Sequence, residues 1–213
     1  MRTHQWRTLA LAATLGMGAA GAQAALQGRD LDGNAATFEA YYDTTQNISW
    51  LADIGAGSAL FYLSDAVTWA SQLSLNGVTG WRLPKTPLRD ATCSIQTANF
   101  SVGTGCTGSE MGHLHEVDGI SITTPGPFLN LHGTDGAGHW SADGFIEGTI
   151  PYNYVYFFAL ASTGVGVVGA SRHSAWAVHD GDVGNVVAAV PEPGTYAMML
   201  GGLLAVGAVA RRR

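Results

Sequence analysis

Two uncharged apolar segments, one near each end of the chain, confine any water-soluble core to the residues between them. Near the N-terminus, residues 8–20 are small or apolar and follow Arg2 and Arg7. Ala22-Gln23-Ala24 then supplies the small residues that a signal peptidase reads. This order is typical of a secretory signal peptide, so we predict that residues 1–24 are removed after Ala24. A buried N-terminal helix is the alternative.

The second apolar segment predicts a membrane helix at residues 195–213. Residues 195–210 form a stretch of 16 uncharged residues, and three arginines follow. A helix of this length spans about 24 Å, and arginines that reach toward the head groups compensate for the shortfall against a hydrocarbon core of roughly 30 Å. Because arginine clusters stay cytoplasmic, the body of the chain is expected outside the membrane.

The body between these segments is acidic and large enough to fold by itself. Residues 25–190 number 166 and carry five basic and fifteen acidic side chains, a net charge near −10. This balance argues against a nucleic-acid partner, which requires basic patches. A chain of this size can bury a sufficient core without disulfides or metal ions. The two cysteines, Cys93 and Cys106, predict one disulfide in an exported protein, with a redox pair or metal ligands as alternatives.

Short β-branched and aromatic segments separated by Gly, Asn and Asp favour an α+β fold with short strands, one or two helices and long loops. One helix is expected to begin at Ser64, as the N-cap, and to be ended by Asn76-Gly77, and a second is expected from Ser109 to Val117. Strands are predicted at residues 38–42, 48–51, 152–161, 165–168 and 174–178.

No pattern of catalytic or metal-binding residues stands out. No serine has a Gly-x-Ser-x-Gly context. His113 and His115 would point apart on a helix, and His132 and His139 follow no known ligand spacing. The Asp30–Asn34 segment has its glycine too early for a calcium loop and lacks the closing glutamate. We therefore predict no metal, no cofactor and no enzymatic activity.

The linker at residues 188–194 contains Val190-Pro191-Glu192-Pro193-Gly194, directly before the apolar segment and the arginines. Together these parts resemble a PEP-CTERM sorting signal, with Pro191, Glu192 and Pro193 as the motif. The resemblance implies an exosortase as sorting partner, besides signal peptidase. It also implies transient anchoring in the inner membrane of a Gram-negative bacterium, then release to the cell surface or exopolysaccharide matrix. An ordinary C-terminal anchor is the alternative.

Residues 25–187 resemble the Lcl-type C-terminal domain. The resemblance is carried, in the family's order, by residues 42–45, 48–51, 69–70, 77–84, 109–114, 139–141, 176–178 and 181–182. It implies a C-type-lectin-like or sulfatase-modifying-factor-like α+β fold and a role in adhesion or in glycan or matrix binding. The chain departs from the family at Pro87, which weakens an expected helix, and at His179, where the family commonly has arginine.

The Trp81-Arg82-Leu83-Pro84 element is interpreted as a structural motif. Large aromatic residues at strand ends usually fill cores, so we expect Trp81, Trp140 and Trp176 to be buried and Arg82 to pair with a carboxylate. A sugar stacked on Trp81 is the alternative. Taken together, the sequence predicts an exosortase-sorted binding or structural module, adhesin-like, with exopolysaccharide or another glycan as candidate ligand. An enzyme acting on envelope polysaccharide is the second hypothesis.

Overall fold

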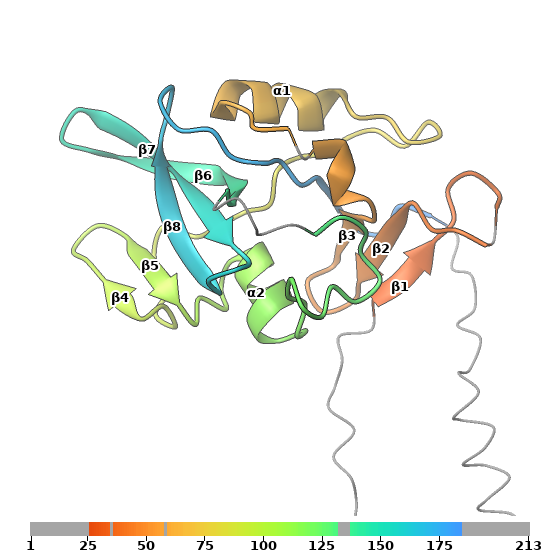
Figure 1. Cartoon of the computed structure of the whole chain (residues 1–213), viewed down its shortest axis with the longest axis horizontal. Helices are drawn as coiled ribbons and strands as arrows, with labels where there is room; N and C mark the ends of the chain where they lie inside the picture. Colours follow the sequence, from red (N-terminus) through yellow and green to blue (C-terminus); the bar gives the residue numbers. More distant parts are fainter. Residues whose placement is uncertain (1–25, 35, 58, 132–136, 185–213) are drawn as a thin grey trace, which may run out of the picture.

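The computed structural model describes residues 26–34, 36–57, 59–131 and 137–184, and the fold is mixed α+β, as predicted. Two antiparallel sheets and two α-helices make up this part of the chain (Figure 1). The predicted signal peptide, the Pro191–Pro193 motif and the predicted membrane helix lie outside the described residues. Within the described ranges, no helix has both the length and the apolar character needed to cross a membrane.

The first sheet joins the start of the described chain to its end. Its strands are β1 (Leu26–Arg29), β2 (Ala40–Asp43), β3 (Ile48–Leu51) and β9 (Val178–Asp180), in the order β1-β2-β3-β9. The predicted hairpin is therefore present, with its first strand beginning two residues later than expected. Its turn contains Asn47 at a φ of 53°, and the Tyr42 hydroxyl donates to the Asn47 side chain at 2.7 Å.

The second sheet has the order β4-β5-β8-β7-β6. Its strands are β4 (Ile95–Gln96), β5 (Ser101–Thr104), β6 (His139–Glu147), β7 (Ile150–Phe157) and β8 (Ser162–Val167). The strand predicted at residues 152–161 ends early, because the chain turns after Phe157 and Ala161 adopts a φ of 49°.

The strand predicted at residues 174–178 is wrong, because this segment passes from one sheet to the other. Ser174 pairs with the second sheet, where its carbonyl accepts from the Trp140 backbone N–H at 2.9 Å. Val178 begins β9 of the first sheet. The three residues between them, Ala175 to Ala177, are fully buried. This apolar run, which the sequence pattern predicts as a strand, is therefore a buried connection between the two sheets.

The two α-helices are α1 (Leu63–Gln72) and α2 (Glu110–Glu116), and a 3-10 turn, η1, covers Ile54–Gly57. Ser64 is not the N-cap of α1, and the helix ends at Gln72, before the predicted end at Asn76-Gly77, because Leu73 is extended. Phe61 pairs with His173, so the helix starts right after the extended Tyr62, which makes no side-chain cap. Ser109 does cap α2, as predicted, because its hydroxyl accepts from the Gly112 N–H at 2.9 Å.

Four tryptophans dominate the core, which is divided into two clusters. Trp50, Trp81 and Trp176 pack with Met111 and Leu114 of α2 between the sheets. Trp140 belongs to a second cluster beneath α1, with Leu83 and Val155. Trp81 is 2% exposed, and Trp140 and Trp176 are 0% exposed. Each of these three indole N–H groups donates to a backbone carbonyl, so the rings fill the interior.

Candidate functional site

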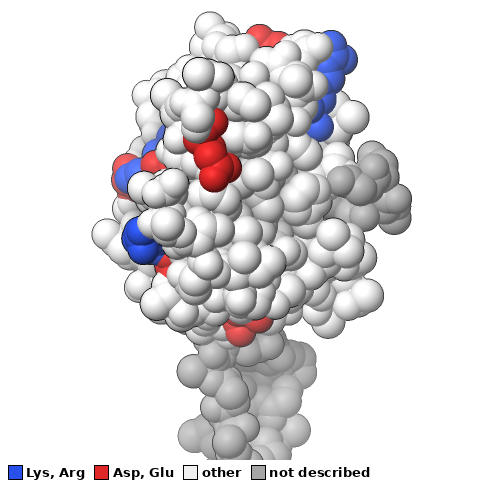
Figure 2. Space-filling model, turned by 90° about the vertical axis from the view of Figure 1, so that its left-hand side faces the viewer, with Lys and Arg blue, Asp and Glu red and all other residues white. Residues whose placement is uncertain are grey.

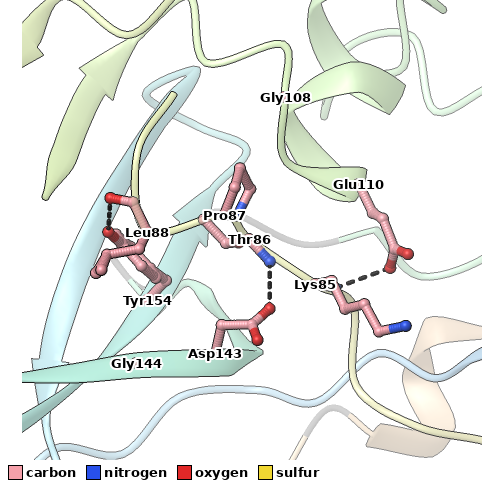
Figure 3. Close-up of a pocket in the computed structure, with 9 residues that line it drawn as sticks. All are labelled: Lys85, Thr86, Pro87, Leu88, Gly108, Glu110, Asp143, Gly144 and Tyr154. Atoms are coloured by element: carbon pink, nitrogen blue, oxygen red, sulfur yellow. Dashed lines mark hydrogen bonds between the residues drawn. The ribbon is translucent and has the colours of Figure 1, made fainter. Parts of the chain in front are cut away.

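A groove of about 420 Å³ opens where residues 85–88 run between the start of α2 and strands β6 and β7 (Figure 3). Residues from four segments line it: Lys85, Thr86, Pro87, Leu88, Gly108, Glu110, Asp143, Gly144 and Tyr154. The Trp81–Pro84 element leads directly into the groove, and residues 85–88 are neither helix nor strand. Backbone groups of this segment are therefore available to be held by side chains.

Side chains from three elements hold this groove segment in place. The Lys85 N–H donates to Glu110 and the Thr86 N–H donates to Asp143, both at 2.8 Å (Figure 3). The Tyr154 hydroxyl donates to the Leu88 carbonyl, also at 2.8 Å. Because α2, β6 and β7 each supply one of these partners, the groove wall is organised before any ligand arrives.

Arg82 joins α2 to β9 at the edge of the groove. Its guanidinium forms two parallel hydrogen bonds to Glu110, at 2.9 and 2.8 Å, and a further contact with Asp180. Burial acts to lower the pKa of Arg82, but the hydrogen bonds that Arg82 donates to the carboxylates of Glu110 and Asp180 outweigh it and raise the pKa. The hydrogen bond that Asp180 accepts from Arg82 lowers the pKa of Asp180. Arg82 thus has the carboxylate partner that the sequence indicated, and both Glu110 oxygens are engaged.

An aromatic column, defined as Phe100, Phe145 and Tyr152, extends from the groove. Phe100 and Phe145 stack with centroids 4.3 Å apart and ring planes at 18°. Phe145 stacks on Tyr152 at 5.7 Å and 24°, and it also contacts Tyr154 of the groove at 5.5 Å. All three rings of the column are half-buried. Polar groove and aromatic column are therefore continuous through Tyr154.

Sequence reasoning missed this column, although one local signal was present. Tyr152 and Tyr154 are two residues apart on β7, a spacing that places both rings on one face of a strand. Gly144 allows β6 and β7 to approach each other closely, because an added Cβ would lie 2.1 Å from the Asn153 side chain and 2.2 Å from the Tyr152 carbonyl.

The face of the molecule in Figure 2 carries few charged groups, which leaves wide uncharged areas around them.

The remaining candidate residues are dispersed. Cys93 and Cys106 form a disulfide next to β4 and β5. His113 and His115 both lie on α2 but face different partners, since His113 approaches Asp118 at 3.8 Å and His115 approaches Tyr156. His139 packs between the rings of Phe158 and Trp176, whereas His132 lies outside the described residues.

The carboxylates of Asp30, Asp32 and Glu39 lie within 4.8 Å of one another on the loop after β1. Their oxygens accept local backbone N–H groups, including those of Gly33, Asn34 and Leu31. The cluster therefore stabilises its own loop through these hydrogen bonds.

Residues 189–213 match the model of the PEP-CTERM protein-sorting motif. The chain is accordingly an exported protein that an exosortase sorts through a membrane-anchoring signal at its C-terminus. No curated protein and no solved structure matches the chain. The lectin-like character of residues 25–187 stays a prediction that rests on the residues quoted above.

Proposed function

We propose that this protein is a non-enzymatic binding module of the cell surface or exopolysaccharide matrix, and that it holds glycan in the groove and along the aromatic column. The observation that carries the proposal is the continuity of a polar groove with a stack of half-buried rings. A lectin-like Lcl-type domain, whose relatives are linked to glycan and matrix binding, is the fold that we assign to this role.

Sugars match both parts of this surface. Their C–H faces pack on aromatic rings, which offer large apolar area with defined geometry, and their hydroxyls need fixed hydrogen-bond partners. Asp143 uses Oδ2 to accept from Thr86. Its Oδ1 has no donor among the described residues, so this oxygen is available to a ligand hydroxyl. The acidic body of the chain favours neutral or cationic sugars over acidic ones.

The groove carboxylates are poorly placed for glycoside cleavage. Such chemistry needs one carboxyl group as a proton donor and another as base or nucleophile. Both oxygens of Glu110 accept from Arg82, and one of them also accepts from the Lys85 N–H. A carboxylate engaged in this way is a member of an ion pair, not a proton donor. This arrangement favours binding over the alternative of an enzyme acting on envelope polysaccharide.

A glycan array probed with the exported protein tests the proposal, followed by titration with the best ligand. Phe145→Ala is expected to weaken binding at least about tenfold, equivalent to about 1.4 kcal/mol, because it interrupts the column. Asp143→Asn keeps an acceptor for Thr86 and provides a second variant. Ile146→Ala, at the exposed neighbouring position of β6, is the matched control.

Thermal unfolding of each variant separates lost binding from lost folding. Failure of the protein to retain any glycan would contradict the proposal, as would equal affinities of folded Phe145→Ala and Ile146→Ala variants. Release of reducing ends from envelope polysaccharide by the wild-type protein would instead support the enzyme.

A further inference from the structure

Asp118, the second residue after α2, is a buried carboxyl group without a hydrogen-bond donor among the described residues. The residue is 8% exposed and its side chain 1% exposed. Neither of its oxygens accepts a hydrogen bond from an N–H or hydroxyl group of the described residues. An ionised carboxylate in such a place has lost water without receiving a replacement, which is strongly unfavourable. A neutral carboxylic acid, which can itself donate, fits the site better.

Among the described residues, Asp43 and His113 are the titratable groups that interact with Asp118 or lie beside it. Asp43, at the end of β2, is fully buried. Its carboxylate accepts from the backbone N–H groups of Thr45 and Gln46 and from the Gln46 side chain, at 2.8 to 3.0 Å. On α2, His113 Nε2 lies 3.8 Å from Asp118 Oδ1. Asp43 is therefore held as an acceptor by its own turn, and its carboxylate interacts with the Asp118 carboxyl group.

Burial is the main cause that raises the pKa of Asp118, and the neighbouring Asp43 raises it further, to about 7. Two carboxyl groups in contact in a dry place cannot both be ionised at low cost. The burial of Asp118 and the nearby carboxyl group of Asp43 therefore both favour the neutral form of Asp118.

We propose that Asp118 is held as the neutral acid and shares its proton with Asp43, so that the docking of α2 on the first sheet requires a bound proton. The turn after Asp43 is tied to the helix as well, because the Gln46 side chain donates to the Glu110 carbonyl at the start of α2, at 3.2 Å. Because α2 buries Met111 and Leu114 in the core, a weakened contact lowers the stability of the whole domain.

The direction of the pH dependence follows from proton counting. An aspartate in the unfolded chain has a pKa of about 3.9. Between about pH 4 and pH 7 the folded protein binds one proton more than the unfolded chain at this site, so its stability falls as pH rises through that window. Above about pH 7 both states are ionised at Asp118, and this contribution becomes constant. The inference does not depend on the glycan groove.

Thermal unfolding of the exported protein between pH 5 and pH 8 tests this proposal. We expect the unfolding midpoint of the wild type to fall, relative to that of Asp118→Asn, by on the order of 5 °C over this range. The asparagine amide donates to Asp43 at every pH, so this variant should be the more stable protein at pH 8. Glu147→Gln, which removes a charge from an exposed position of β6, should follow the wild type.

Three outcomes would overturn the proposal. The first is a constant difference between wild type and Asp118→Asn across the pH range. The second is loss of the pH dependence in His113→Gln but not in Asp118→Asn, which would make the histidine the titrating group. The third is a rise in the wild-type midpoint at pH 8 with Ca²⁺ or Zn²⁺ that Asp118→Asn lacks, since the site would then hold a metal ion instead of a proton.

Discussion

Arg29 is the clearest case in which one residue ties distant parts of the chain together. Its side chain is fully buried and pairs with Asp182 through two hydrogen bonds of 2.5 and 2.8 Å. It also donates to the Gly28 carbonyl and lies 5.0 Å from the centre of the Tyr42 ring. The hydrogen bond from Arg29 lowers the pKa of Asp182. In a chain with few charges, this pair connects β1 to the last described residues.

Asp182→Asn should destabilise the protein by about 2–3 kcal/mol, because it leaves the guanidinium of Arg29 buried without its counter-charge. This is less than the roughly 3–5 kcal/mol of a pair that is buried on both sides, since Asp182 is one-third exposed. Urea unfolding measures the change. In the wild type, the stabilisation is present at neutral pH and is lost as pH falls below about 4, because the unfolded chain then binds the proton first.

The double variant Arg29→Met with Asp182→Asn is the control for this prediction. It removes both charges and should recover part of the stability lost in Asp182→Asn. A double variant less stable than the single one would mean that Arg29 acts through packing and not through its charge.

At the scale of elements, the hairpin of β4 and β5 is the least supported part of the second sheet. β4 has two residues, and β5 pairs with β8 through only two residue pairs, Gly103 with Thr163 and Thr104 with Ser162. The disulfide between Cys93 and Cys106 closes this hairpin over a separation of 13 residues. A covalent staple therefore acts where strand pairing is short.

Cys93→Ser should lower the free energy of unfolding by roughly 2–4 kcal/mol, because the unfolded chain regains the freedom of the closed loop. Chemical denaturation of the oxidised protein measures the loss. As a control, a reducing agent should destabilise the wild type by a similar amount and leave the Cys93→Ser, Cys106→Ser double variant unchanged. Equal stability of wild type and Cys93→Ser would contradict a stapling role.

At the scale of the whole molecule, the folded domain and the sorting motif are close in the chain. The Arg29–Asp182 pair brings the two ends of the described domain together at one side (Figure 1). Pro191 follows Asp182 by nine residues, and nine fully extended residues span at most about 32 Å. The exosortase must therefore act within roughly this distance of the first sheet.

Replacement of Pro191, Glu192 and Pro193 by alanine should block processing, because the sorting enzyme recognises this motif. Mass spectrometry of the envelope fraction should then find residues 195–213 still attached, whereas the wild-type protein ends near Pro191. Replacement of Ala188 and Ala189 by serine, in the same linker, is the matched control. An attached tail in the wild type would contradict exosortase processing.

The sequence by itself determined the features that depend on residues close together in the chain. Sorting is encoded in the short segment at residues 189–213, where the match to the sorting motif confirms it, while the signal peptide at residues 1–24 stays a prediction. The cap at Ser109 and the hairpin around Asn47 depend on neighbours a few positions apart. Capping and turn formation are local interactions, so local patterns were sufficient to predict them.

Only the tertiary structure decided which distant residues meet. Tyr154 joins the groove to the aromatic column, and Asp43 faces Asp118 from a position 75 residues away in the sequence. The apolar run before Val178 reads as one strand, yet it crosses between two sheets. Periodicity records that a residue is buried, but not against what. The groove, the column and the acid pair arise from packing between segments, which the order of the residues alone does not express.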